Sequence, residues 1–151
     1  MKLFLLRHGD AEPGTADRVR PLSIYGREQV AQLAMQHMDA AKSIKQVVSS
    51  PYLRAVQTAK IFTQVTHKNN IAIDWLDDLT PLGDPRAIQG FLQQTQADTV
   101  LMVSHLPLVG LLVDYLTGET GTRMGTANLA SLSMDYPAQG MATLNWIHYV
   151  D

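Results

Sequence analysis

Residues 99–105 have the sequence Thr99-Val100-Leu101-Met102-Val103-Ser104-His105. Its four consecutive apolar residues are typical of a short strand that is buried on both faces of a sheet. The helical pattern of residues 106–117 follows at once, and Gly118 is suited to end that helix. A buried strand followed directly by a helix indicates an α/β protein.

The same alternation extends over the whole chain. Short apolar runs predict strands and longer periodic segments predict helices, with Ser23 as the cap of the first helix and Pro51 in the first turn of the second. The predicted strands are residues 2–6, 45–50, 71–75, 99–104, 127–134 and 142–149, the last two near a sheet edge; the predicted helices are 23–40, 51–66, 86–94 and 106–117, with loops at 10–24 and 77–85. We therefore expect a single domain over residues 1–151, built as a three-layer α/β/α sandwich around a mostly parallel sheet.

The composition excludes several classes of protein. The chain has 151 residues, no cysteine and a formal net charge of −2. Disulfides and thiolate chemistry are thus ruled out, and no general basic surface is available for nucleic acid. No apolar run is long enough to cross a membrane, and the apolar start is too short for a signal peptide. We expect a cytoplasmic protein without membrane insertion.

Three polar clusters directly follow three of the predicted strands. They are Arg7-His8-Gly9, Ser49-Ser50-Pro51-Tyr52-Leu53-Arg54 and Ser104-His105. The carboxyl ends of parallel strands meet at one edge of a sheet, which is where ligands bind in open α/β folds. Buried cations gathered there need an anionic partner, so the pattern favours an anion site.

Phosphoryl transfer fits this set of residues. Arginine forks match the phosphoryl oxygens, and a neutral imidazole can attack phosphorus. Nearby arginines disfavour the charged imidazolium, which keeps the attacking nitrogen free near neutral pH. Gly9 allows close approach of the backbone or offers its carbonyl to orient the ring. His37, His67 and His148 show no metal-ligand spacing or shared cluster, so we predict surface or structural positions for them and no metal or other cofactor.

These residues also carry a resemblance to a known family. Leu6-Arg7-His8-Gly9 resembles the signature of the histidine phosphatase superfamily, which includes the phosphoglycerate mutases. Ser49 to Ala59 resembles its second motif, and Ser104-His105 its third. The resemblance implies a phosphoglycerate mutase-like fold, His8 as the nucleophile, and Arg7, Arg54 and His105 as the phosphate pocket.

Within that superfamily the chain looks most like the SixA-type phosphohistidine phosphatases. Arg7 to Ala11 and Ser104 to Gly110 match their longer motifs, and the chain is similarly short, without a cap insertion. By this analogy Arg20 is a further phosphate contact, although it is also readable as a surface charge. Asp78 stands where relatives often carry a proton donor, and the alternative for it is a solvated acidic turn. Asp10 and Ser104 are expected to orient the site.

The resemblance implies a metal-independent enzyme with a covalent phosphohistidine intermediate. Its expected substrate is a phosphohistidine on a partner protein, a histidine phosphotransfer (HPt) domain of a phosphorelay sensor kinase, because an uncapped site leaves room for a protein. We expect the enzyme to act as a monomer. The alternatives are a phosphomonoesterase for small metabolites and a non-catalytic phosphate-binding protein.

Overall fold

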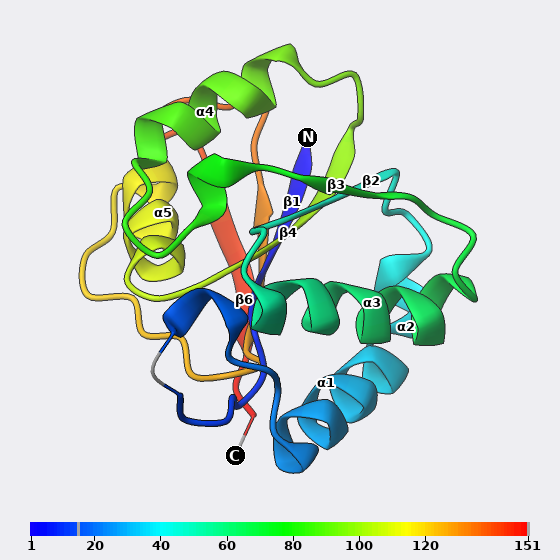
Figure 1. Cartoon of the computed structure of the whole chain (residues 1–151). Coiled ribbons are helices and arrows are strands. Elements are labelled where there is room, and N and C mark those ends of the chain that lie inside the picture. Colours follow the sequence, from blue (N-terminus) through cyan, green and yellow to red (C-terminus); the bar gives the residue numbers. More distant parts are fainter. Residues whose placement is uncertain (15, 151) are drawn as a thin grey trace.

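The computed structural model describes residues 1–14 and 16–150, and these form a six-stranded mixed sheet between two layers of helices (Figure 1). In chain order the described elements are β1 (Lys2–Arg7), η1 (Asp17–Val19), α1 (Ile24–Gln36), α2 (Met38–Ala41), β2 (Gln46–Ser49), α3 (Leu53–His67), β3 (Ile73–Trp75), η2 (Asp77–Leu79), α4 (Pro85–Gln94), β4 (Thr99–Ser104), α5 (Leu108–Thr117), β5 (Leu129–Ser133) and β6 (Thr143–His148). The strand order is β3-β2-β4-β1-β5-β6. The first four strands in this order are parallel, β5 pairs antiparallel with β1, and β6 pairs antiparallel with β5.

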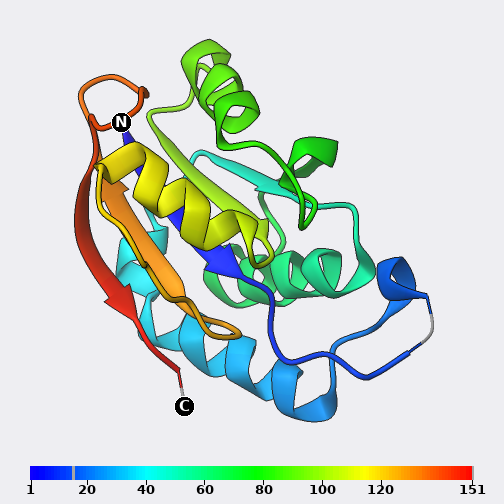
Figure 2. The same ribbon diagram turned by 90° about the vertical axis from the view of Figure 1, so that its left-hand side faces the viewer.

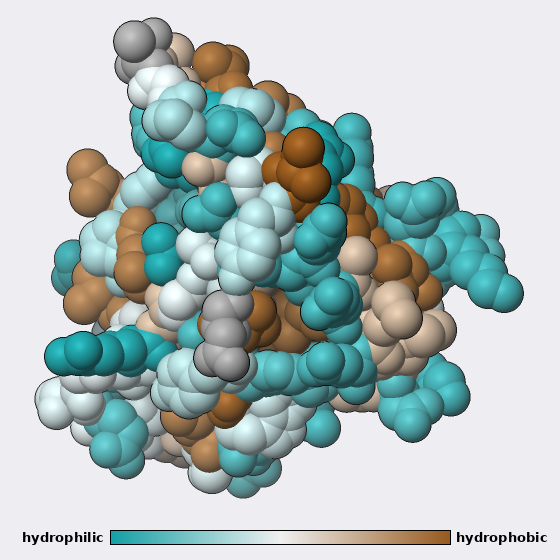
Figure 3. Space-filling view, turned by 90° about the horizontal axis from the view of Figure 1, so that it is seen from below, coloured by the Kyte–Doolittle hydropathy of each residue, from teal (hydrophilic) through white to brown (hydrophobic). Residues whose placement is uncertain are grey.

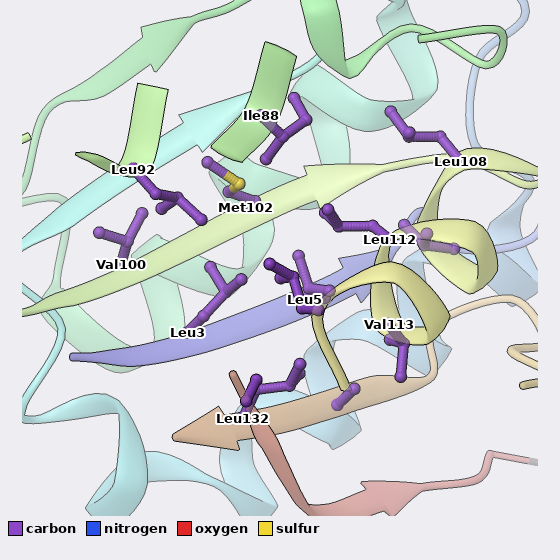
Figure 4. Packing of buried hydrophobic residues seen from close by; sticks show 14 of the residues in the cluster. Leu3, Leu5, Ile88, Leu92, Val100, Met102, Leu108, Leu112, Val113 and Leu132 are labelled. Carbon is purple, nitrogen blue, oxygen red and sulfur yellow. The ribbon is translucent and has the colours of Figure 1, made fainter. Parts of the chain in front are cut away.

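Two hydrophobic cores, one on each face of the sheet, hold the layers together. Figure 2 shows α1 and α3 on one side of the sheet and α4 and α5 on the other. In the core on the α4 and α5 side, Leu3 and Leu5 of β1 and Met102 of β4 pack beneath these two helices (Figure 4). The alternate residues of β1, Phe4 and Leu6, point to the other face and lie in the core under α1 and α3. Because both faces are covered, the central strands read as continuous apolar runs.

The predicted α/β/α architecture is confirmed, and the differences lie at the ends of helices. The predicted helix 23–40 is broken at His37, whose backbone (φ −116°, ψ 24°) leaves the helical region before α2 begins. Placing Pro51 in the first helical turn was wrong, because α3 begins at Leu53 after an extended Tyr52. Each of the two predicted loops contains a short 3₁₀ turn, η1 or η2. Ser23 does cap α1, since its Oγ accepts a hydrogen bond from the Gly26 amide.

Over residues 1–14 and 16–150, no helix is long and apolar enough to cross a membrane. The face seen from below in Figure 3 carries its hydrophobic residues in separate patches among hydrophilic ones.

One contact between distant segments was not foreseen. We predicted no shared cluster for His37 and His148, but the structure hydrogen-bonds His37 Nε2 to His148 Nδ1. The His37 ring also stacks on Trp146, with centroids 4.9 Å apart. The pair joins the end of α1 to the edge strand β6, which is a structural position, as expected for both histidines.

Candidate active site

The ends of β1, β2 and β4 bring the predicted site residues together at one edge of the sheet. β4 pairs with both β1 and β2, and Arg7 lies opposite Ser104 in the register. The side chains of His8, Arg54 and His105 are buried there, with the two imidazole rings 5.0 Å apart between centroids. Four sequence-predicted residues, His8, Arg7, Arg54 and His105, thus converge on one place, as the strand-end argument requires.

The backbone of the next residue fixes the orientation of the His8 ring. His8 Nδ1 lies 2.7 Å from the Gly9 carbonyl oxygen, so Nδ1 carries the proton and Nε2 carries the lone pair. Consistently, Arg54 Nε donates to His8 Nε2 at 3.2 Å. Gly9 is required by close packing: a Cβ at this position would lie 2.8 Å from the Gly26 carbonyl oxygen on α1.

Both histidines are held neutral. Burial lowers the pKa of His8 to about 4; the hydrogen bond to Gly9 opposes this, and the charges of Arg54, Arg7 and Arg20 reinforce it. Burial also lowers the pKa of His105 to about 3, with further contributions from His8 and Arg54. At neutral pH, His8 Nε2 is therefore an unprotonated nitrogen in a cationic pocket.

In the part of the chain that the structure describes, two of the pocket's side chains, Arg7 and His105, each have a buried nitrogen without a hydrogen-bond partner. Arg7 Nη1 donates to the Met124 carbonyl at 3.1 Å, while burial and the charge of Arg54 lower the pKa of Arg7. Among the described residues, buried Arg7 Nε and His105 Nδ1 have no hydrogen-bond partner. Buried polar atoms without partners are uncommon, and the oxygens of a bound anion would satisfy such donors.

A serine and a tyrosine that follow β2 surround His105. His105 Nε2 is 2.7 Å from Ser50 Oγ, and Ser50 Oγ also accepts the Tyr52 amide at 3.2 Å. The Tyr52 ring meets His105 edge-on at 5.1 Å and lies 5.3 Å from the Arg54 guanidinium carbon. The segment between β2 and α3 thus contacts one imidazole and one guanidinium of the pocket.

Arg20 lies at the rim of the pocket, where it directly follows the η1 turn and pairs with Asp17 of that turn. Arg20 Nε donates to the Glu12 carbonyl at 2.8 Å, and Arg20 Nη1 pairs with Asp17 at 3.1 Å. Arg20 is close enough that its charge lowers the pKa of His8. Its place is therefore compatible with the predicted phosphate contact.

Asp78 stands apart from the other predicted residues. It lies on η2 with its side chain exposed, and within residues 1–14 and 16–150 no hydrogen bond or ion pair joins it to His8, Arg7, Arg54 or His105. Ser104 Oγ donates to the Leu79 carbonyl at 2.6 Å, which fastens η2 to the end of β4. Asp10 accepts the Ser23 hydroxyl at 2.6 Å and so anchors the loop after β1 to α1.

Sequence reasoning gave no role to three side chains that organise the pocket. Thr58 Oγ1 accepts the Gly9 amide at 3.1 Å and donates to the Arg54 carbonyl at 2.8 Å. Gln29 Oε1 accepts the Asp10 amide at 2.9 Å. Asp17 contacts both Arg20 and Arg54. The available signal was helical spacing: Thr58 is four residues after Arg54 and shares its face of α3.

An α/β/α sandwich with two neutral imidazoles and several arginines at the carboxyl edge of its sheet defines a protein built to handle phosphoryl groups. Among the described residues, no group of three His, Cys, Asp or Glu side chains could hold a metal ion. The chain belongs to the histidine phosphatase superfamily: the sequence profile of branch 1 of that superfamily matches residues 3–80. It is accordingly a hydrolase with the phosphoglycerate mutase-like fold.

Its relatives include phosphatases of similar length. The chain is 37% identical to the phosphohistidine phosphatase SixA of Escherichia coli K12 over 97% of this chain and 92% of that protein. It is 33% identical to a SixA homologue of Haemophilus influenzae over 79% of both chains. A structure of the protein histidine phosphatase SixA complexed with tungstate superimposes with a TM-score of 0.90 and 35% identity, over 99% of this chain and 97% of that one.

Proposed function

We propose that this chain is a metal-independent phosphohistidine phosphatase, with His8 Nε2 as the nucleophile. The observation that carries the proposal is the single hydrogen bond from His8 Nδ1 to Gly9, which leaves Nε2 unprotonated beside Arg54. His8 is also neutral at physiological pH, because the pKa of its imidazole is lowered to about 4 by burial and neighbouring arginines. The relationship to SixA supports the same reaction.

The proposed reaction has two steps. His8 Nε2 attacks the phosphorus of a phosphohistidine, the P–N bond to the substrate imidazole breaks, and a P–N bond to His8 forms. Water then attacks this phosphohistidine, releasing inorganic phosphate and returning His8 with its lone pair. Arg7, Arg54, Arg20 and His105 bind the phosphoryl oxygens and stabilise their charge in both transition states.

The position of Asp78 bears on the leaving group. A phosphorylated imidazole leaves readily once its other nitrogen is protonated, whereas an alkoxide needs a well-placed acid. Asp78 is exposed and makes no bond to the pocket among the described residues, so no contact within the protein holds it in place as a proton donor. An acid held this loosely favours phosphohistidine over phosphate esters as the substrate.

The surroundings of the pocket favour a protein substrate. A groove of about 500 Å³, lined by Arg18, Val19, Pro51, Leu53, Val56 and Trp75, shares both η1 and the segment before α3 with the pocket. Val19 and Trp75, exposed by 63% and 51%, supply apolar surface in this groove against which residues of a partner protein can pack. We propose that the chain, as one monomeric cytoplasmic domain over residues 1–151, dephosphorylates the histidine of an HPt domain in a phosphorelay, and that this groove receives residues beside that histidine.

The decisive experiment is dephosphorylation of a histidine-phosphorylated HPt domain, with a chelator present, by the wild type, His8→Ala and His67→Ala. His67 lies at the opposite end of α3 from Arg54 and serves as the matched control. We expect the wild type and His67→Ala to remove the phosphate and His8→Ala to be inactive. An active, folded His8→Ala protein would show that His8 is not the nucleophile. Hydrolysis of small esters only would move the substrate to metabolites, and inactivity on both would indicate a binding protein.

A further inference from the structure

The turn η1 places a carboxylate between two arginines of the pocket. Asp17 Oδ2 lies 3.3 Å from Arg54 Nη2, and Asp17 Oδ1 lies 3.1 Å from Arg20 Nη1. The backbone carbonyl of Asp17 also accepts Arg54 Nη1 at 2.7 Å. In Figure 1, η1 (dark blue) lies directly beside the start of α3, which carries Arg54. Two segments of the pocket, the η1 turn with the adjacent Arg20 and the start of α3, are thus joined through one acidic residue.

The way Asp17 holds Arg54 determines which edge of the guanidinium faces the nucleophile. The two terminal nitrogens, Nη1 and Nη2, both bond to Asp17. Nε instead donates to His8 Nε2 at 3.2 Å. In a planar guanidinium, Nε–H and one N–H of Nη2 lie side by side on the lateral edge. That edge therefore points at the place where a phosphoryl group attached to His8 Nε2 would be, with two parallel donors.

Arg54 is a buried cation, which needs a compensating charge in this orientation. It is buried beside another cation, and its charge contributes to the lowered pKa of Arg7. Arginine side chains also lose conformational entropy when they are held in one geometry. Asp17, whose side chain is 54% exposed, supplies the opposite charge from the rim. The hydrogen bonds and charges of Arg20 and Arg54 outweigh the desolvation of Asp17 and lower the pKa of its carboxyl group, so it is ionised at neutral pH.

We propose that Asp17 is a positioning residue, which holds the guanidinium groups of Arg54 and Arg20 ready to receive the phosphoryl oxygens at His8. Asp17 does not touch the reacting atoms itself; it acts through the two arginines. The proposal rests on the proposed function for its role in turnover. The underlying prediction about anion binding depends only on the geometry.

The opposite reading is that Asp17 competes with phosphate for the same two arginines. The contacts favour positioning, because Asp17 takes the terminal edge of Arg54 and leaves the lateral edge for the ligand. Positioning and competition predict opposite signs: removal of the carboxylate weakens anion binding in the first case and strengthens it in the second.

The test compares Asp17→Ala and Asp17→Asn with Asp39→Ala. Asp39 also pairs with a cation three residues away, Lys42, but on an exposed surface, so it controls for loss of one surface ion pair. Tungstate and inorganic phosphate binding would be measured by calorimetry, urea unfolding would report stability, and kcat and KM would be determined on a histidine-phosphorylated HPt domain and on a small phosphate ester.

For Asp17→Ala we expect tungstate binding weakened about 10-fold or more and kcat lowered by about 10- to 100-fold, with unfolding unchanged. Asp17→Asn should recover part of both losses, because its amide oxygen can still accept from one arginine. Asp39→Ala should match the wild type.

Unchanged or tighter anion binding in folded Asp17→Ala would overturn the proposal. So would an equal loss in Asp17→Asn and Asp17→Ala when both are destabilised to the same extent, because a purely structural role gives that result. If no protein hydrolyses phosphohistidine but tungstate binding still weakens in Asp17→Ala, the positioning of the arginines holds and the proposed function fails.

Discussion

Replacing Gly26 with alanine should disturb the site through the helix that supports it. A Cβ at Gly26 would lie 2.0 Å from the Asp10 carbonyl oxygen, and 2.9 Å from the Asp10 amide nitrogen and carbonyl carbon. Real Cβ atoms keep at least 3.0 Å from such atoms, so α1 and the loop after β1 must separate by about 1 Å. The atoms that collide belong to the backbone, which cannot rotate away as a side chain would.

The size of the effect follows from two opposing contributions. Alanine in a helix is favoured over glycine by about 0.5–1 kcal/mol. The forced separation costs about 1–3 kcal/mol, as overpacking commonly does, so we expect a net loss of about 1–2 kcal/mol in the free energy of unfolding. Asp10 directly follows Gly9, whose carbonyl orients His8, so a shift of about 1 Å should lower kcat by about 100-fold.

The assay pairs urea unfolding with phosphatase activity of the folded protein. The matched control is Gly90→Ala on α4, where an added Cβ meets nothing within 4 Å. This control should gain about 0.5–1 kcal/mol with unchanged activity. A Gly26→Ala protein as stable and active as the wild type would refute the steric argument. Lower stability with full activity would show that the loop after β1 does not position His8.

Three further predictions concern pH, the groove and His105. Because the pKa values of His8 and His105 are lowered in the folded protein, the unfolded chain binds more protons below pH 6.5. The free energy of unfolding should therefore fall as the pH is lowered from 6.5 to 4, by up to about 1.4 kcal/mol per pH unit for each histidine. Urea unfolding that does not change between pH 7 and 5 would contradict this prediction. Trp75→Ala should raise KM for a phosphorylated HPt domain about 10-fold and leave a small substrate unaffected, with exposed Met141→Ala as the control; equal effects on both substrates would exclude groove binding. Ser50→Ala should leave His105 Nε2 without its partner and lower kcat about 10-fold without loss of His8 phosphorylation in a trapping assay, whereas wild-type kcat would show that Ser50 does not orient the ring.

Local sequence was sufficient for the order of the main strands and helices and for the choice of candidate site residues. Apolar runs such as residues 100–103 can be buried only in a covered sheet, and polar residues that follow such runs must gather at its carboxyl edge. The structure brings the four residues that this reasoning selected, His8, Arg7, Arg54 and His105, together at that edge. It did not show where a helix would break: His37, where α1 ends, is hydrogen-bonded to His148, 111 residues away, a contact that local sequence does not reveal.

The chemical state of the site was decided by contacts between distant segments. Whether His8 presents Nδ1 or Nε2 depends on a carbonyl that the tight Gly9–Gly26 packing holds in place. Which edge of Arg54 faces that nitrogen depends on Asp17, 37 residues earlier in the chain. The sequence by itself determined the strands, the strand-end histidines and arginines, and the family. Only the tertiary structure decided the protonation, the orientation and the bonded partners of those residues, because electrostatic and hydrogen-bond energies depend on distances of a few ångströms that sequence spacing does not encode.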